Sequence, residues 1–309
     1  MGLPHVATRG SLVSRRRAFN PLVLVFLGPA FAIMAYVVAY PLLRTFWLSL
    51  LHVELVDPDH QAFVGLGNFL ALVHDATFWQ SLARTLVFTS ISVAASFVFG
   101  LGFALLADGL PGRFAAARGL LLVPWVTPAV VVGFLFLYMF DQEVGVVNLL
   151  LTHLHVIQHG LAWLSDADLA LATVIAANVW SQTPFFVLMF TAGLTAIPPT
   201  QREAIRIDGA RGWAEFRHLI VPYLRHIMVI ASLIAIINNF SSFTVIWTLT
   251  QGGPVYATTT LAVQIYRVAF QQFKFGYGAA MGVVWMLVLL VLSAVYIRTL
   301  QREALTEIG

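Results

Sequence analysis

The sequence contains no cysteine and few charged residues, and each shortage excludes a class of protein. Without cysteine the chain can form no disulfide, no thiolate metal site and no cysteine nucleophile. Charged residues make up 10% of the 309 residues and apolar residues 60%, whereas soluble proteins contain roughly 25% and 45–50%. So few charges could not cover that much apolar surface in a soluble domain. The composition therefore predicts an integral membrane protein.

Lysine is almost absent, which excludes a nucleotide-binding motif. The seventeen basic residues are sixteen arginines and one lysine, Lys274. A P-loop needs a lysine followed by Ser or Thr to hold phosphates, but Lys274 is followed by Phe275. The chain therefore carries no Walker-type site of its own. We interpret the calculated pI of 9.4 as loop charge that orients membrane spans and predict no nucleic-acid partner.

Apolar runs long enough to cross a bilayer occur six times. A span needs roughly 20 apolar residues. The runs lie at about 22–43, 85–107, 119–140, 169–195, 223–249 and 277–298. The first run exceeds the apolar region of a secretory signal, so we expect a retained membrane helix.

The basic residues are distributed unequally between the two sides of these spans. Thirteen fall in the segments 1–21, 108–118, 196–226 and 298–309, and four fall on the other side. The positive-inside rule makes the first side cytoplasmic. We therefore predict six transmembrane helices with both termini in the cytoplasm.

The longest cytoplasmic connection, at 198–222, begins with signals for a short helix and a turn. Pro198–Pro199 should end the preceding span, because proline cannot continue helical hydrogen bonding. Thr200 with Glu203 has the spacing of a capping box, which predicts a helix start. Gly209 allows a sharp turn that a side chain would strain.

A second short helix is expected after this turn, before Pro222 leads into the fifth span. Its apolar residues at helical spacing are Trp213, Phe216 and Leu219. Two short helices joined by a glycine form a projection that a partner protein can bind. On the residues alone, a loop whose arginines bind anionic lipid headgroups is an equal alternative.

This loop resembles the EAA loop of bacterial ABC importer permeases, in which E-A-A-x-x-D-G-A is followed by I-x-L-P. The matching residues are Glu203, Ala204, Asp208, Gly209, Ala210 and Pro222. Further matches over roughly 40–280 narrow the resemblance to carbohydrate permeases of the maltose and glycerol-phosphate type. They include Phe63–Phe69, Pro124-Trp125 with Pro128, Trp180 with Pro184, and Leu249–Pro254.

The resemblance implies an all-α integral membrane protein with the type I ABC importer permease architecture. It implies a permease subunit, in the bacterial plasma (inner) membrane, that takes up a di- or oligosaccharide such as trehalose or a maltose-like sugar. The implied partners are a second homologous permease in a heterodimer, two ATPase subunits, a periplasmic or lipid-anchored sugar-binding protein and membrane lipid. The chain itself would be no enzyme and bind no cofactor, because ATP and magnesium belong to the ATPase subunits. The EAA residues above would couple to the ATPase.

On this reading the chain divides into segments. We expect a cytoplasmic N-terminal segment at 1–21, a first transmembrane helix with its outer loop at 22–83, and a cytoplasmic tail at 299–309. A core permease domain of five transmembrane helices, with the EAA coupling loop at 198–222, would occupy 84–298.

Polar residues within two spans are candidates for a substrate pathway. Asn178, Gln182 and Phe185 share one face of the fourth span, and Asn239 and Ser242 share one face of the fifth. Amides and hydroxyls can bind sugar hydroxyls, but they also hold membrane helices together. The residues alone leave both alternatives open. The resemblance places Gln182, Phe185, Asn239 and Ser242 on the substrate.

Charged side chains are missing from the middles of the spans, which bears on the competing functions. A stand-alone secondary transporter would be expected to place acidic or basic groups there, so this class is less favoured. Glycerol 3-phosphate is the alternative substrate, although a phosphate would favour cationic groups near its path. The outer-loop histidines His153, His155 and His159 have no convincing carboxylate partner, so we predict no metal site.

Overall fold

The computed structural model describes residues 21–54, 61–109 and 119–306. The described chain is mainly helical and divides into two compact units, Met1–Trp47 and Leu48–Gly309. The short N-terminal unit contains α1 (Pro21–Met34), the π-helical η1 (Ala35–Ala39) and most of α2 (Tyr40–Ser49). Together they form a helix that is apolar over the 24 residues Phe26–Ser49 and long enough to cross a membrane. The expected first span therefore exists and extends six residues beyond 43.

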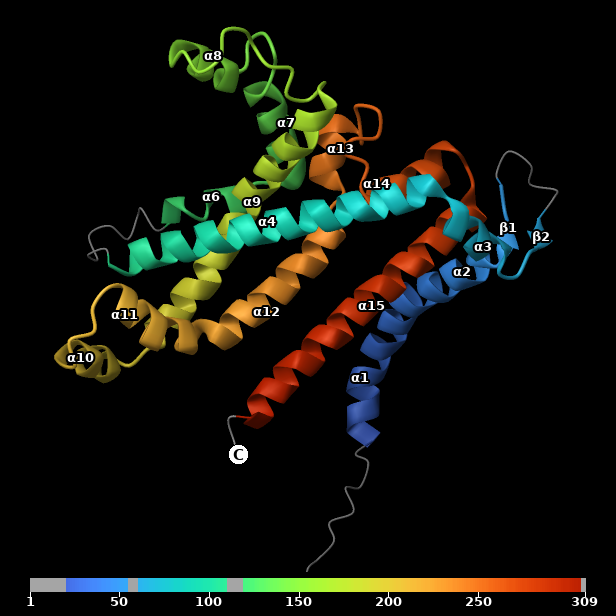
Figure 1. The fold of residues 1–309 in the computed structure, drawn as a ribbon. Helices are drawn as coiled ribbons and strands as arrows, with labels where there is room; N and C mark the ends of the chain where they lie inside the picture. The colour runs from blue at the N-terminus through green and yellow to red at the C-terminus, as the bar shows by residue number, and fades with distance from the viewer. Residues whose placement is uncertain (1–20, 55–60, 110–118, 307–309) are drawn as a thin grey trace, which may run out of the picture. The chain divides into compact units, whose positions relative to one another are not determined.

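The larger unit contains most of the long apolar helices (Figure 1). These are α4 (Ala76–Asp108), α9 (Ala167–Thr195), α15 (Phe275–Thr306) and a helix from α11 (Trp213–Glu215) through the π-helical η3 (Phe216–Ile220) into α12 (Val221–Phe240). With the N-terminal helix, the described residues hold five helices long and apolar enough to span a membrane. The second, fourth and sixth expected spans are confirmed, and α4 begins nine residues before 85.

The third expected span, at about 119–140, is present as a shorter apolar helix that follows a break. α6 (Val123–Val126) and α7 (Ala129–Met139) are separated at Thr127 and Pro128. Thr127 has an extended backbone, with φ −74° and ψ 125°, because a following proline disfavours the helical conformation. The third apolar segment is therefore a short helix, a kink and a helix of 11 residues.

The fifth span also differs from the prediction at both ends. α12 ends at Phe240, and the separate helix α13 (Thr244–Thr250) follows, so 223–249 is not one helix. The expected second short helix does not stand alone, because α11 continues through η3 into α12. The Val221 N–H bonds to the carbonyl of Phe216, five residues back. This wider turn accommodates Pro222, which has no N–H to donate.

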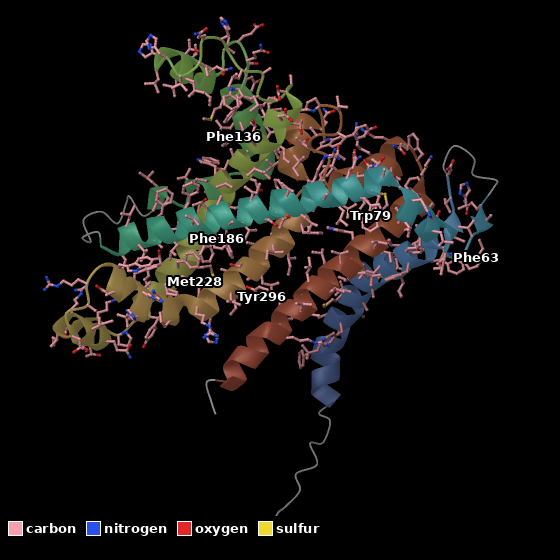
Figure 2. The ribbon with its side chains drawn as sticks, viewed as in Figure 1. Phe63, Trp79, Phe136, Phe186, Met228 and Tyr296 are labelled. Atoms are coloured by element: carbon pink, nitrogen blue, oxygen red, sulfur yellow. The ribbon has the colours of Figure 1, made fainter. Side chains whose placement is uncertain are left out.

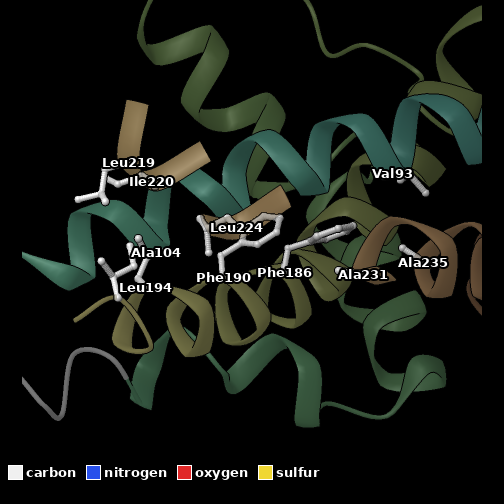
Figure 3. Packing of buried hydrophobic residues seen from close by; sticks show 11 residues of the cluster. Val93, Ala104, Phe186, Phe190, Leu194, Leu219, Ile220, Leu224, Ala231 and Ala235 are labelled. Atoms are coloured by element: carbon white, nitrogen blue, oxygen red, sulfur yellow. The ribbon is translucent and has the colours of Figure 1, made fainter. Parts of the chain in front are cut away.

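A buried apolar cluster joins α4, α9 and α12. Phe186, Phe190 and Leu224 are fully buried within it, and Ala104 and Ala231 let the helices approach closely (Figure 3). Phe97 on α4 meets the rings of Phe186 and Phe190 with centroid distances of 5.8 and 5.1 Å. A second cluster, which contains Phe136 and Val174, packs α7 and α13 against α9. Figure 2 shows Phe136 and Phe186 at different levels of the unit.

Short elements complete the end of the larger unit at which α4 and α15 begin (Figure 1). β1 (Leu51–His52) pairs antiparallel with β2 (Ala62–Phe63), with Leu51 opposite Phe63. α3 (Gly67–His74) precedes α4, and α14 (Leu261–Tyr266) with the π-helical η4 (Arg267–Gln271) precedes α15. Glu54 forms a β-bridge with Lys274.

Asp75 joins the starts of α4 and α15. Its carboxylate accepts hydrogen bonds from the amides of Thr77 and Phe78 as the N-cap of α4, and from the Tyr277 hydroxyl at 2.7 Å. Burial alone would raise the pKa of Asp75, but these hydrogen bonds lower it below its ordinary value of 3.8. The ionised carboxylate is therefore the form that caps α4.

Asn148, on α8 (Val146–His153), holds the segment between α7 and α9 in place. Its amide nitrogen donates to the carbonyls of Asp141, Gln142 and Leu161. Its oxygen accepts from the Leu161 N–H and from the Trp163 indole at 2.8 Å. One buried amide thus connects both ends of this segment.

Asn148→Ala is expected to destabilise this segment, because it leaves several buried polar groups unpaired, each at a cost of about 1–3 kcal/mol. The thermal midpoint in detergent should fall, and the environment-sensitive fluorescence of Trp163 should change. Asn148→Asp keeps the size and an acceptor oxygen, but it replaces the donor with a carboxylate oxygen that faces three carbonyls, so it should destabilise the segment at least as much. Equal midpoints for the alanine variant and the unaltered protein would contradict this role.

Candidate functional site

A polar cavity lies beside the broken third span. Its volume is about 370 Å³, and it is bounded by α6, α7, α9 and α12. The lining residues are Pro124, Trp125, Thr127, Ala129, Val132, Ser181, Gln182, Phe185 and Asn238. None of the described lining residues is charged. Broken helices frame substrate sites in many transporters, because backbone at membrane depth is tolerated only against protein or a watery cavity.

Gln182 and Phe185, which were expected on the pathway, both line this cavity. They lie three residues apart on α9 and therefore share a face. Across the cavity, Trp125 on α6 is 51% exposed. The chain thus places an amide and two aromatic rings around one space, a combination suited to a polyhydroxylated molecule.

Asn178 and Asn239, also expected on the pathway, instead bond α9 to α12. Both are about 2% exposed, and the Asn178 amide donates to the Asn239 oxygen. The Asn239 amide donates to the Gln182 oxygen at 3.3 Å and to the Ala235 carbonyl at 2.8 Å. The Asn239 side chain is therefore occupied by helix contacts. The geometry favours the interhelical alternative for this pair.

The placement of Ser242 also corrects the sequence analysis. It cannot share a helix face with Asn239, because α12 ends at Phe240 and Ser242 lies in the turn before α13. The Ser242 N–H bonds to the Asn239 carbonyl at 3.0 Å. Neither residue is among those that line the described cavity.

The cavity lining also includes residues that were not among the candidates, among them Trp125, Ser181 and Asn238. The sequence analysis used Trp125 only as part of the family resemblance, and the structure places it on the cavity. Asn238 was overlooked beside Asn239, although neighbouring helix positions differ by about 100° and so face different surroundings. The amide pattern carried the signal, but the residues alone did not decide which amide faces the cavity.

Alanine variants of two adjacent residues, Asn238 and Asn239, distinguish a residue that lines the cavity from one that holds two helices together. Asn239→Ala should lower stability by roughly 0.6–1.7 kcal/mol, the range for hydrogen bonds between membrane helices. The folded remainder should transport normally. Asn238→Ala should leave the thermal midpoint nearly unchanged and reduce transport. A thermal midpoint and an uptake rate per folded protein, measured for both variants, test this assignment. The reverse pattern would overturn it.

The coupling-loop candidates lie at the opposite end of the larger unit from β1 and α3 (Figure 1). α10 spans Pro199–Ile207, so it begins four residues before Glu203. The capping box expected from Thr200 and Glu203 does not form, because the N-cap is Pro198 and makes no side-chain bond. Proline fits the first helical position, which needs no N–H donor, and this explains the earlier start.

Gly209 ends α10 in the geometry of a Schellman motif. Its φ is +82°, a left-handed value that favours glycine. The Gly209 N–H bonds to the Arg206 carbonyl at 3.1 Å, and the Ala210 N–H bonds to the Ile205 carbonyl at 3.0 Å. Together these two bonds satisfy carbonyls that the helix end leaves free.

The outward face of α10 is available to a partner. Glu203, Ala204 and Asp208 are exposed, as is Ile207 at 85%. Trp213 on α11 is 71% exposed and stacks on Phe216 with centroids 5.2 Å apart. Pro222 is located apart from this surface, in the first turn of α12. Acidic and apolar groups thus form a mixed projecting surface.

Comparison with known proteins identifies the family. Residues 100–305 match the family described as binding-protein-dependent transport system inner membrane components. The chain belongs to this family. It is therefore a multi-pass component of an inner-membrane transport system, and the resemblance carried by the EAA-like loop is confirmed.

Similar proteins include named permeases. The chain is 32% identical to the sulfoquinovosyl glycerol transport system permease protein SmoG of Agrobacterium fabrum, over 91% of each chain. It is 31% identical to the trehalose/maltose transport system permease protein MalF of Thermococcus litoralis, over 87% of this chain and 90% of that protein.

A solved structure shows the same fold. This is a crystal structure of a bacterial ABC transporter involved in the import of the acidic polysaccharide alginate. It matches with a TM-score of 0.79 at 20% identity and covers 91% of this chain and 95% of the other. The likeness supports the expected ABC importer permease architecture.

Proposed function

We propose that this chain is the permease subunit of an ABC importer for an uncharged sugar, such as trehalose or a maltose-like saccharide. Family membership supports the permease role, and the trehalose/maltose relative supports a sugar. The importer would need a second permease, two ATPase subunits that bind ATP and magnesium, and an external sugar-binding protein. The present chain would supply part of the pathway and no ATPase chemistry.

The observation that carries the sugar assignment is the chemistry of the cavity. Gln182, Asn238 and Ser181 offer groups that can donate to and accept from sugar hydroxyls. Phe185 and Trp125 offer apolar faces for the C–H side of a sugar ring. The described lining supplies no cation for glycerol 3-phosphate, so the neutral substrate is favoured over this alternative.

Reconstitution of the complete importer tests the proposal. A tag on this permease should copurify a second permease and two ATPase chains per permease pair. In proteoliposomes with the loaded binding protein, trehalose or maltose should enter only when ATP is supplied. Uptake of glycerol 3-phosphate instead of both sugars would overturn the sugar assignment alone. Uptake driven by an ion gradient without ATPase chains would overturn the importer assignment.

The orientation is part of the proposal and has its own test. The distribution of arginines supports cytoplasmic termini and a cytoplasmic α10. Because the chain has no cysteine, single cysteines report cleanly. Cysteines at Ser14 and Thr306 should resist an impermeant thiol reagent in intact cells, and one at Asp141 should react. Labelling at Ser14 from outside would reverse the orientation.

A further inference from the structure

α10 contacts the rest of the larger unit through one narrow face. Arg202 and Ile205 are half-buried and three residues apart, whereas the rest of this fully described helix is exposed. Ile205 packs against the apolar cluster of α4, α9 and α12. Arg202 supplies one polar contact, and Arg206 supplies a second, with its Nη2 3.2 Å from Oε1 of Glu215 on α11. Any force on the outward face of α10 must pass through these contacts or through the flanking chain.

The Arg202 guanidinium binds the ends of two long helices at once. Its Nη1 is 2.7 Å from Oδ2 of Asp108, the last residue of α4. Its Nη2 donates to the Leu194 carbonyl, in the last turn of α9, at 2.9 Å. Side-chain exposures of 22% and 24% for the ion pair show that it is partly shielded from solvent. A planar guanidinium can make both bonds simultaneously, whereas a lysine ammonium is a single point charge.

The position of Asp108 at the end of α4 indicates that its carboxylate needs a cation beside it. An acidic residue in the last turn of a helix is electrostatically unfavourable, because that end carries partial negative charge. The Arg202 cation offsets this charge and also satisfies a terminal carbonyl of α9. The pair joins residues 94 positions apart in the chain. It therefore fixes α10 to α4 and α9 together.

The two helices that Arg202 binds lead to the cavity. α9 carries Gln182, which lies about 18 Å along the helix from Leu194 at a rise of about 1.5 Å per residue. α4 packs along α9 through Phe97 and Phe186. A displacement of α10 can therefore reach the cavity lining through rigid elements.

We propose that Arg202 is a positioning residue that couples movement of α10 to α4 and α9, and hence to the cavity. This inference rests on the proposed function, in which the ATPase moves α10. Without the guanidinium, α10 stays attached through Ile205, the Arg206–Glu215 ion pair and the flanking chain, but its displacement is no longer passed to the ends of α4 and α9. ATP hydrolysis then continues with less movement at the cavity.

The test uses the complete importer of two permease and two ATPase chains. A single cysteine replacing Ser181, a cavity-lining residue, reports on the cavity through its rate of reaction with a thiol reagent. The rate is compared with and without ATP and vanadate. In this background, Arg202→Ala should retain hydrolysis but reduce the nucleotide-dependent change in rate at least fivefold. Arg217→Ala, an exposed arginine on η3 rather than α10, is the matched control and should keep the change.

Three further variants separate coupling from folding. Asp108→Asn keeps the size of the side chain and leaves the bond from Arg202 to the Leu194 carbonyl in place. It should therefore reduce the nucleotide-dependent change in reaction rate only in part. Arg202→Asp combined with Asp108→Arg should restore part of what Arg202→Asp loses. The proposal would be overturned if Arg202→Ala kept the full nucleotide-dependent change in reaction rate. It would also be overturned if Arg202→Ala and Asp108→Asn each lost ATP hydrolysis to the same extent as this change. This experiment uses no sugar, so its result does not depend on whether the substrate assignment is correct.

Discussion

Gly209→Val is expected to stop ATP-driven uptake while the permease remains in the membrane. Gly209 has φ +82°, and a Cβ there would meet no atom within 4 Å. The cost is therefore backbone strain alone, about 1–2 kcal/mol for an ordinary residue and more for a β-branched one. Relief of this strain would open the Schellman bonds at Arg206 and Ile205 and reshape the surface that α10 offers to the ATPase.

A graded series makes this prediction specific. Asn tolerates left-handed backbone better than Val, so Gly209→Asn should retain more uptake and more copurified ATPase. Gly119 also has open space around it but no left-handed φ, so Gly119→Val is the control and should have little effect. The measurements are sugar uptake, ATPase copurification and permease abundance. Unchanged uptake in Gly209→Val would show that the turn is not needed for coupling.

The long helices could be predicted from the sequence because burial in lipid demands continuous apolar residues. The fourth span, expected at 169–195, is α9 at Ala167–Thr195. The breaks could not be predicted in the same way. A proline in an apolar run permits either a continuous helix, as at Pro184 in α9, or a break, as at Pro128. Tertiary packing decides between them.

The site was harder to predict than the fold, because its contacts join distant residues. Asn239 meets Asn178, 61 positions away, and Arg202 meets Asp108, 94 away. Nothing local distinguishes Arg202 from the other arginines of its loop, or Asn238 from Asn239. A helix boundary wrong by one residue rotates the predicted face by about 100°, which is enough to exchange a cavity residue for a helix contact.

Gly100→Leu should prevent stable packing of α4 on α9 and produce the largest loss of folded protein. A Cβ at Gly100 would lie 2.3 Å from the Cβ of Phe186 and 3.3 Å from its backbone. Phe186 is fully buried and held by the rings of Phe97 and Phe190. Neither partner can move away without separating the helices. Overpacking of a tight core costs about 1–3 kcal/mol, and more where backbone must shift.

The same helix supplies the control for this variant. Gly102 has no atom within 4 Å of an added Cβ and is exposed, so Gly102→Leu should be neutral or slightly stabilising, because leucine favours helix by about 0.8 kcal/mol over glycine. Membrane abundance and the thermal midpoint in detergent compare the two. Adding Phe186→Gly to Gly100→Leu should recover part of the loss, because it removes the Cβ that the new side chain meets. Equal midpoints for the two leucine variants would mean that α4 and α9 do not meet at Gly100, whereas recovery by Phe186→Gly would identify Phe186 as the residue that meets it.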